Sequence, residues 1–167
     1  MSSLNEIKAV IKKISEIGNL GQHMCFFGGS VPYIYYNKES NREHSDIDIL
    51  IDKKYIDVIR QLAKQNNLYI PKLDSLNLDL GDDYGLKIFI DGVYVEFEPM
   101  YIDNGMLVRK SFSPNKELAG TESIPFKELT DLIVSIDIEK YHRVKKSLEL
   151  SETSITSYED LRSKKTL

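Results

Sequence analysis

Residues 24–30 have the sequence MCFFGGS, a short apolar run that leads directly into Gly28, Gly29 and Ser30. The run has the length of a buried strand, and the two glycines end it. Ser30 is a favourable residue at the start of a helix because its hydroxyl can accept a hydrogen bond from a backbone N–H of the first turn. The stretch predicts a strand, a glycine turn and a short helix, in that order.

Residues 46–51, DIDILI, alternate acidic with aliphatic side chains. Successive side chains of a strand point to opposite faces, so Asp46 and Asp48 share one face of the predicted strand. Two neighbouring carboxylates repel each other unless a cation lies between them. Oxygen ligands without histidine or cysteine favour Mg²⁺ or Mn²⁺ over Zn²⁺. In isolation, such a pair is more often a solvated strand face.

Apolar residues recur at helical spacing in three further segments, which are residues 4–17, 55–65 and 126–148. This periodicity predicts amphipathic helices, the last segment forming one long helix or two short ones. The residues from 151 onward are polar. We therefore expect one domain over residues 1–150 and a polar C-terminal tail over residues 151–167.

Asp91-Gly92 separates two apolar runs, residues 86–90 and 93–97, and is a signal for a two-residue hairpin turn. Asn104-Gly105 suggests another hairpin turn, which leads to a strand at residues 106–108. The second run carries Glu96 on the same face as Glu98, which follows it. A carboxylate within such an apolar strand needs a partner. If this strand lies beside the Asp-x-Asp strand, either glutamate completes a three-carboxylate metal site. In isolation, both are more often the polar face of an ordinary strand.

The composition is that of a globular domain, with 167 residues, 41% hydrophobic residues and a formal net charge of -4. The negative charge supplies no general basic field for a long nucleic acid. No apolar run approaches the roughly 20 residues that span a membrane, and the N-terminus lacks the pattern of a signal peptide. Cys25, the single cysteine, is interpreted as a buried core residue. We expect a cytoplasmic protein without membrane contact.

These motifs, taken together and in this order, resemble the nucleotidyltransferase superfamily that shares its catalytic core with DNA polymerase beta. The resemblance covers residues 24–99 through FFGGS at 26–30, DIDIL at 46–50 and VEF at 95–97. Within the superfamily, the chain is most similar to small stand-alone bacterial enzymes such as the lincosamide and abortive-infection nucleotidyltransferases. The resemblance implies the nucleotidyltransferase fold, in the α/β (α+β) class. Its sheet would be mixed and largely antiparallel, with helices flanking it.

The resemblance also assigns roles to the motif residues. The turn at Gly28, Gly29 and Ser30 would hold the triphosphate of a nucleotide, and Asp46 and Asp48 would bind the Mg²⁺ ions that bridge to it. The interval between the turn and the aspartates is somewhat longer than is usual in the family. The preferred nucleotide, ATP or another NTP, stays open.

Glu96 takes the position of the third acid, as a metal ligand and as the first choice for general base, with Glu98 as the alternative. Arg42 and His44 precede the aspartate pair and are candidates for phosphate contacts, although loop residues of these types are more often simply solvated. The third acid is Glu here, where the family frequently has Asp.

The resulting hypothesis is transfer of a nucleoside monophosphate from an NTP to a hydroxyl of a small molecule such as an antibiotic. Alternatives are toxin-type modification of tRNA or protein, a non-catalytic nucleotide-binding domain, and a structural domain with surface acids. A nucleic-acid partner is left open. A homodimer is one way in which so small a chain encloses its substrate.

Overall fold

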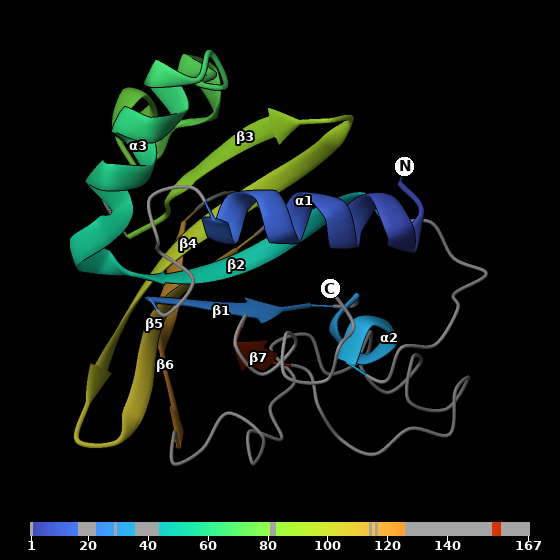
Figure 1. The fold of residues 1–167 in the computed structure, drawn as a ribbon. Helices are drawn as coiled ribbons and strands as arrows, with labels where there is room; N and C mark the ends of the chain where they lie inside the picture. The colour runs from blue at the N-terminus through green and yellow to red at the C-terminus, as the bar shows by residue number, and fades with distance from the viewer. Residues whose placement is uncertain are drawn as a thin grey trace.

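A computed structural model describes residues 2–16, 23–28, 30–35, 44–80, 83–113, 115, 117–125 and 155–157 (Figure 1). Its helices are α1 (Leu4–Glu16), α2 (Val31–Tyr35) and α3 (Ile56–Gln65), with the 3-10 turns η3 (Lys53–Tyr55), η4 (Pro71–Leu73) and η5 (Ser75–Leu78). Its strands are β1 (Met24–Phe27), β2 (Asp46–Asp52), β3 (Leu86–Ile90), β4 (Val93–Asp103), β5 (Met106–Phe112), β6 (Leu118–Pro125) and β7 (Ile155–Ser157). None of these helices is long and apolar enough to span a membrane.

The strands form one mixed sheet in the order β6-β5-β4-β2-β1-β7, and β3 also pairs with β4. β2 and β4 run parallel, while every other described pair is antiparallel. Figure 1 shows α1 lying along the sheet and α3 beside the β3–β4 hairpin. The predicted fold class, a mixed and largely antiparallel sheet flanked by helices, is confirmed.

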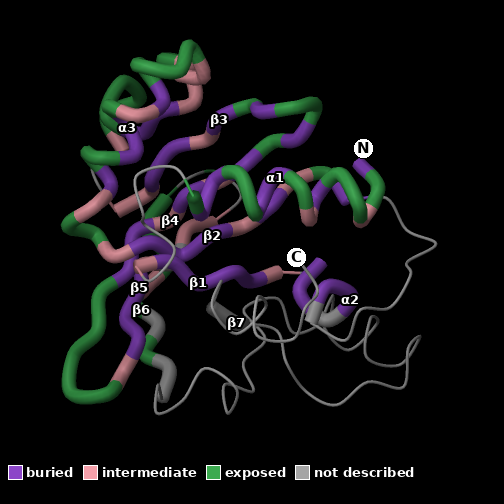
Figure 2. Tube along the Cα trace, in the orientation of Figure 1, coloured by how far each residue is buried: buried purple, intermediate pink, exposed green. Residues whose placement is uncertain are grey.

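The alternation of side chains along the strands separates a core face from a polar face. On β2, Ile47, Ile49 and Ile51 are buried in the main apolar cluster, whereas Asp46 and Asp48 point to the opposite face. Figure 2 shows burial concentrated along the strands and the inner sides of the helices. The helical residues in this core are Ile7, Val10, Ile11, Ile14, Val31, Ile34, Ile56, Ile59 and Ala63. The amphipathic helices predicted over residues 4–17 and 55–65 therefore pack on the sheet as expected.

The N-terminus of α1 carries a reciprocal cap that the sequence analysis did not identify. The backbone N–H of Ser3 donates to the Glu6 carboxylate at 2.7 Å, and the backbone N–H of Glu6 donates to the Ser3 hydroxyl at 3.3 Å. Such a capping box satisfies backbone donors that the first helical turn leaves free. It explains why the helix begins at Leu4.

The two predicted hairpin turns have the backbone that their sequences favour. Asp91 and Gly92 have φ angles of 49° and 84°, and Asn104 and Gly105 have 48° and 74°. Positive φ at both central residues is the mark of a type I′ turn, and Asn, Asp and Gly adopt it at the lowest cost. These turns fix the pairing of β3 with β4 and of β4 with β5.

Two strands were not predicted. β6 pairs with β5, and β7 pairs with β1 although it lies within the predicted polar tail. Residues 155–157 of this tail join the edge of the sheet by pairing with β1. The division at residue 150 stays a prediction, and the helices expected over residues 126–148 fall outside the described residues.

Cys25 lies in β1 and is 4% exposed. Burial raises the pKa of its thiol to about 12, so the thiolate is not formed at neutral pH. The interpretation of Cys25 as a core residue is confirmed.

Candidate metal and nucleotide site

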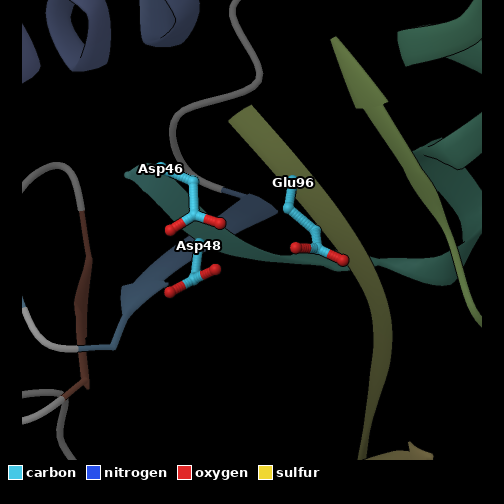
Figure 3. Close-up of side chains that lie close together, drawn as sticks. All are labelled: Asp46, Asp48 and Glu96. Atoms are coloured by element: carbon cyan, nitrogen blue, oxygen red, sulfur yellow. The ribbon is translucent and has the colours of Figure 1, made fainter. Parts of the chain in front are cut away.

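Three carboxylates gather on the polar face of the sheet. The parallel register of β2 and β4 places Asp48 beside Glu96, and Asp46 projects from the same face of β2. One oxygen from each of these three side chains lies within 4.8 Å of the other two. Figure 3 shows the group, with two side chains from β2 and one from β4. We call Asp46, Asp48 and Glu96 the acid cluster.

The donor set of the acid cluster fits a hard divalent cation. All three ligand atoms are carboxylate oxygens, and all three side chains are partly exposed, so that an ion and its water ligands can enter. Two oxygens on opposite sides of a magnesium ion are about 4.2 Å apart, at about 2.1 Å from the metal. The three oxygens of the acid cluster, all within 4.8 Å of one another, are separated by distances of the same order.

The glycine turn after β1 lies directly against the acid cluster. Gly28 has a φ of 87°, and a Cβ atom built on it would overlap the Oδ2 atom of Asp48. Glycine is therefore required here for its backbone conformation and for the close approach. The backbone N–H of Val31 donates to the carbonyl of Gly28, and that of Ile34 donates to the carbonyl of Ser30. The turn thus leads into α2 beside Asp48, while Gly29 is outside the described residues.

Glu96 and Glu98, which the sequence could not separate, lie in different surroundings. Glu96 joins the acid cluster, whereas Glu98 lies opposite Leu50 in the register and binds Arg109 with an oxygen-to-nitrogen distance of 2.5 Å. The guanidinium of Arg109 also lies 5.4 Å from the ring centre of Phe27. Glu98 is therefore a partner of an arginine cation, and Glu96 is the glutamate beside the aspartates.

Lys87 is part of this site and was missed in the sequence. Its Nζ lies 3.1 Å from an oxygen of Glu96 and 3.7 Å from an oxygen of Asp46. Burial by itself would lower the pKa of Lys87, but the carboxylates of the acid cluster raise it above its ordinary value. A two-residue turn at Asp91-Gly92 pairs position 87 with position 96. The hairpin predicted from the sequence therefore already implied that Lys87 lies beside Glu96.

His44 and Arg42 were the candidates for phosphate contacts. His44 is 3% exposed, and its ring packs edge-on against Tyr33 with the ring centres 5.6 Å apart. Its backbone pairs with Ser2 through two hydrogen bonds. The structure thus places His44 inside the protein, beside the strand that carries the aspartates. A role in nucleotide binding stays a prediction for His44, and Arg42 lies outside the described residues.

Comparison with known proteins gives two structural likenesses. The solution structure of the antibiotic-resistance factor ANT(2'')-Ia is similar to this chain with a TM-score of 0.48 and 15% identity, over 96% of this chain and 87% of that one. The crystal structure of ANT(2'')-Ia in complex with adenylyl-2''-tobramycin gives a TM-score of 0.45 and 16% identity, over 84% and 90% of the two chains. No family model matches the sequence, and no curated protein matches it.

Proposed function

We propose that this protein is a magnesium-dependent nucleotidyltransferase that transfers a nucleoside monophosphate from an NTP to a hydroxyl of a small-molecule acceptor. The proposal is carried by one observation, the acid cluster of Asp46, Asp48 and Glu96 with the Gly28 turn packed against it. A divalent cation stabilises three partly exposed carboxylates that lie within 4.8 Å of one another. A glycine turn entering a helix offers backbone N–H groups to phosphate oxygens.

In the proposed reaction, each residue of the site has a distinct task. Asp46 and Asp48 hold the metal, which when bound neutralises charge on the triphosphate and the departing pyrophosphate. The turn at Gly28, Gly29 and Ser30 holds the triphosphate. Glu96 accepts the proton of the acceptor hydroxyl, whose oxygen bonds to the α-phosphorus as the bond from that phosphorus to the pyrophosphate oxygen breaks.

Thermal unfolding with each of the four NTPs, with and without Mg²⁺, tests the nucleotide site. A ligand that binds only the folded state stabilises it by about 2.7 kcal/mol at a concentration one hundred times its Kd. We expect at least one NTP to raise the midpoint of the wild type only when Mg²⁺ is present. The variant Asp46→Ala/Asp48→Ala should not respond, whereas Asp103→Ala, an exposed acid at the end of β4, should respond as the wild type does.

The absence of any shift at millimolar nucleotide would remove the proposal and leave a structural domain with surface acids. If binding is found, incubation with labelled NTP and candidate acceptors distinguishes the remaining cases. Label on a small molecule supports the proposal, and label on tRNA or protein supports the toxin-type alternative. Tight binding without any transfer in these assays supports a non-catalytic domain.

A further inference from the structure

A cavity of about 160 Å³ opens beside Glu96, on the side of the acid cluster away from the glycine turn. Its walls come from η4, η5 and the start of β3. The polar groups that line it belong to Lys72, Tyr84, Lys87 and Glu96, and Leu73 and Leu78 supply apolar surface. We call this cavity the lysine pocket.

The sheet register places the lysine pocket where an attacking hydroxyl is needed. Phe27, which precedes the turn, pairs with Asp48, Asp48 with Glu96, and Glu96 with Lys87. These residues form a row across β1, β2, β4 and β3, with the glycine turn at one end and the lysine pocket at the other. In-line displacement requires the attacking oxygen to approach opposite the leaving pyrophosphate. A triphosphate held at the turn is therefore attacked from the side of the pocket, past Glu96.

The charges of the pocket determine which compounds it accepts. Lys72 and Lys87 contribute two positive charges and Glu96 one negative charge. Glu96 is paired with Lys87 at 3.1 Å, so Lys72 gives the lining of the pocket a net positive charge. A positively charged pocket repels a cationic ligand and attracts an anionic one.

Hydrogen bonds of Asp74 and Ser75 fix the wall of the pocket formed by η4 and η5. Asp74, between η4 and η5, is 1% exposed and accepts hydrogen bonds from Arg60 Nε at 2.9 Å and from the Tyr69 hydroxyl at 2.8 Å. The backbone N–H of Ser75 donates to the carbonyl of Gly85 at 2.9 Å, which ties the wall to the start of β3. These bonds give the pocket a defined shape in the absence of substrate.

Tyr84 also lines the pocket, and its hydroxyl is a hydrogen-bond donor. Its ring packs edge-on against Phe112, with the centres 5.0 Å apart. Burial, together with the nearby Glu96 carboxylate, raises the pKa of Tyr84. The hydroxyl therefore keeps its proton at neutral pH and can donate a hydrogen bond to an anionic group.

We infer that the lysine pocket binds the acceptor, and that this acceptor is a compact hydroxyl compound carrying a carboxylate or phosphate group, not a polyamine. The inference rests on the proposed function and specifies its substrate class. The acceptor hydroxyl gives its proton to Glu96, its acidic group binds Lys72, and its apolar part contacts Leu73 and Leu78.

Backbone NMR of the protein with Mg²⁺ and the α,β-methylene analogue of the stabilising NTP tests the inference, because that analogue fills the nucleotide site and cannot react. Three probes of matched size are titrated: glycerol 3-phosphate, glycerol and 3-amino-1,2-propanediol. We expect glycerol 3-phosphate to shift the signals of Lys72, Leu73 and Tyr84, and the amine not to do so. In Lys72→Glu its affinity should fall about five- to tenfold. The control Lys12→Glu, on the exposed side of α1, should bind as the wild type does.

The inference is overturned if the amine binds in the pocket as well as glycerol 3-phosphate does, if none of the probes shifts these signals, or if Lys72→Glu and Lys12→Glu behave alike. The first step of the titration separates this failure from failure of the proposed function. Shifts on addition of Mg²⁺ and the NTP analogue report on the nucleotide site alone. If those shifts occur and the probes give none, only the assignment of the acceptor pocket is wrong.

Discussion

Two groups of charged side chains on this molecule contrast in how their charge is balanced. Arg60 and Asp74 are 4% and 1% exposed, and their charges pair at 2.9 Å with further hydrogen bonds from Tyr69 to Asp74 and from Arg60 to Asp57. The three carboxylates of the acid cluster are partly exposed, and Lys87 lies within 4 Å of two of them, Asp46 and Glu96.

The contrast follows from the cost of placing charge away from water. A buried ion is tolerated only with a partner and hydrogen bonds, so Arg60 and Asp74 pair with each other and support the fold. A partly exposed cluster can keep a surplus of one sign because water screens it, and that surplus is what a metal ion and its ligand can use. The buried pair therefore supports the fold, whereas the partly exposed carboxylate cluster is the candidate metal site.

Asp48→Asn should have the largest effect, on activity alone. Removing one carboxylate charge from the metal site should lower the rate of transfer at least about a thousandfold, equivalent to about 4 kcal/mol. The free energy of unfolding without Mg²⁺ should stay the same or rise, because repulsion among the carboxylates is relieved. A transfer assay and urea unfolding measure the two quantities, and full activity in this variant would contradict the assignment.

Asp74→Ala, by contrast, should mainly lower the free energy of unfolding. It leaves the buried guanidinium of Arg60 without its main partner, which costs about 3–5 kcal/mol. Urea unfolding measures the loss, with Asp103→Ala as an exposed control. Replacing both partners, in Arg60→Met/Asp74→Leu, should destabilise less than Asp74→Ala, since no uncompensated charge remains. Equal losses in the single and double variants would show that the ion pair is not the cause.

Acid should unfold the protein partly through Asp74. Burial alone would raise the pKa of Asp74, but hydrogen bonds from Arg60, from Tyr69 and from the backbone of Leu76 hold it below its usual value. A carboxyl with a lowered folded pKa adds stability above its unfolded pKa of about 3.9, and that stability is lost as the pH falls further. The free energy of unfolding of the wild type should therefore decrease below about pH 4. Asp74→Asn should show a flatter dependence there, and parallel curves would exclude this role.

Lys87→Met should have the smallest effect on stability and should sharpen the account of the acid cluster. The ammonium group competes with a metal ion for Asp46 and Glu96, so its removal should raise the affinity for Mg²⁺ severalfold. The free energy of unfolding should change by less than about 1 kcal/mol, as for other partly exposed ion pairs. Calorimetric titration with Mg²⁺ measures the affinity, with Lys12→Met as control. A weaker affinity would mean that Lys87 holds the carboxylates in place for the metal.

Local signals were sufficient for much of this fold. The acidic and aliphatic alternation of residues 46–51 predicted a strand with Asp46 and Asp48 on one face, because side chains of a strand alternate whatever surrounds it. The Asp91-Gly92 and Asn104-Gly105 pairs predicted their hairpins because positive φ angles are accessible to these residues. Strand β7 gave no such signal, since three residues paired through their backbone leave little pattern in the side chains.

The third acid shows where local information ends. Glu96 and Glu98 lie on the same face of the same strand, so periodicity treats them alike, and the sequence could state only that one of them joins the aspartates if the strands are neighbours. The parallel register of β2 with β4 places Glu96 beside Asp48, and Arg109 from β5 binds Glu98. Register depends on packing of the whole sheet against its helices, and a shift of two residues would place Glu98 beside Asp48 instead. The amino-acid pattern thus specified the chemistry of the site, and long-range packing selected the residues that meet there.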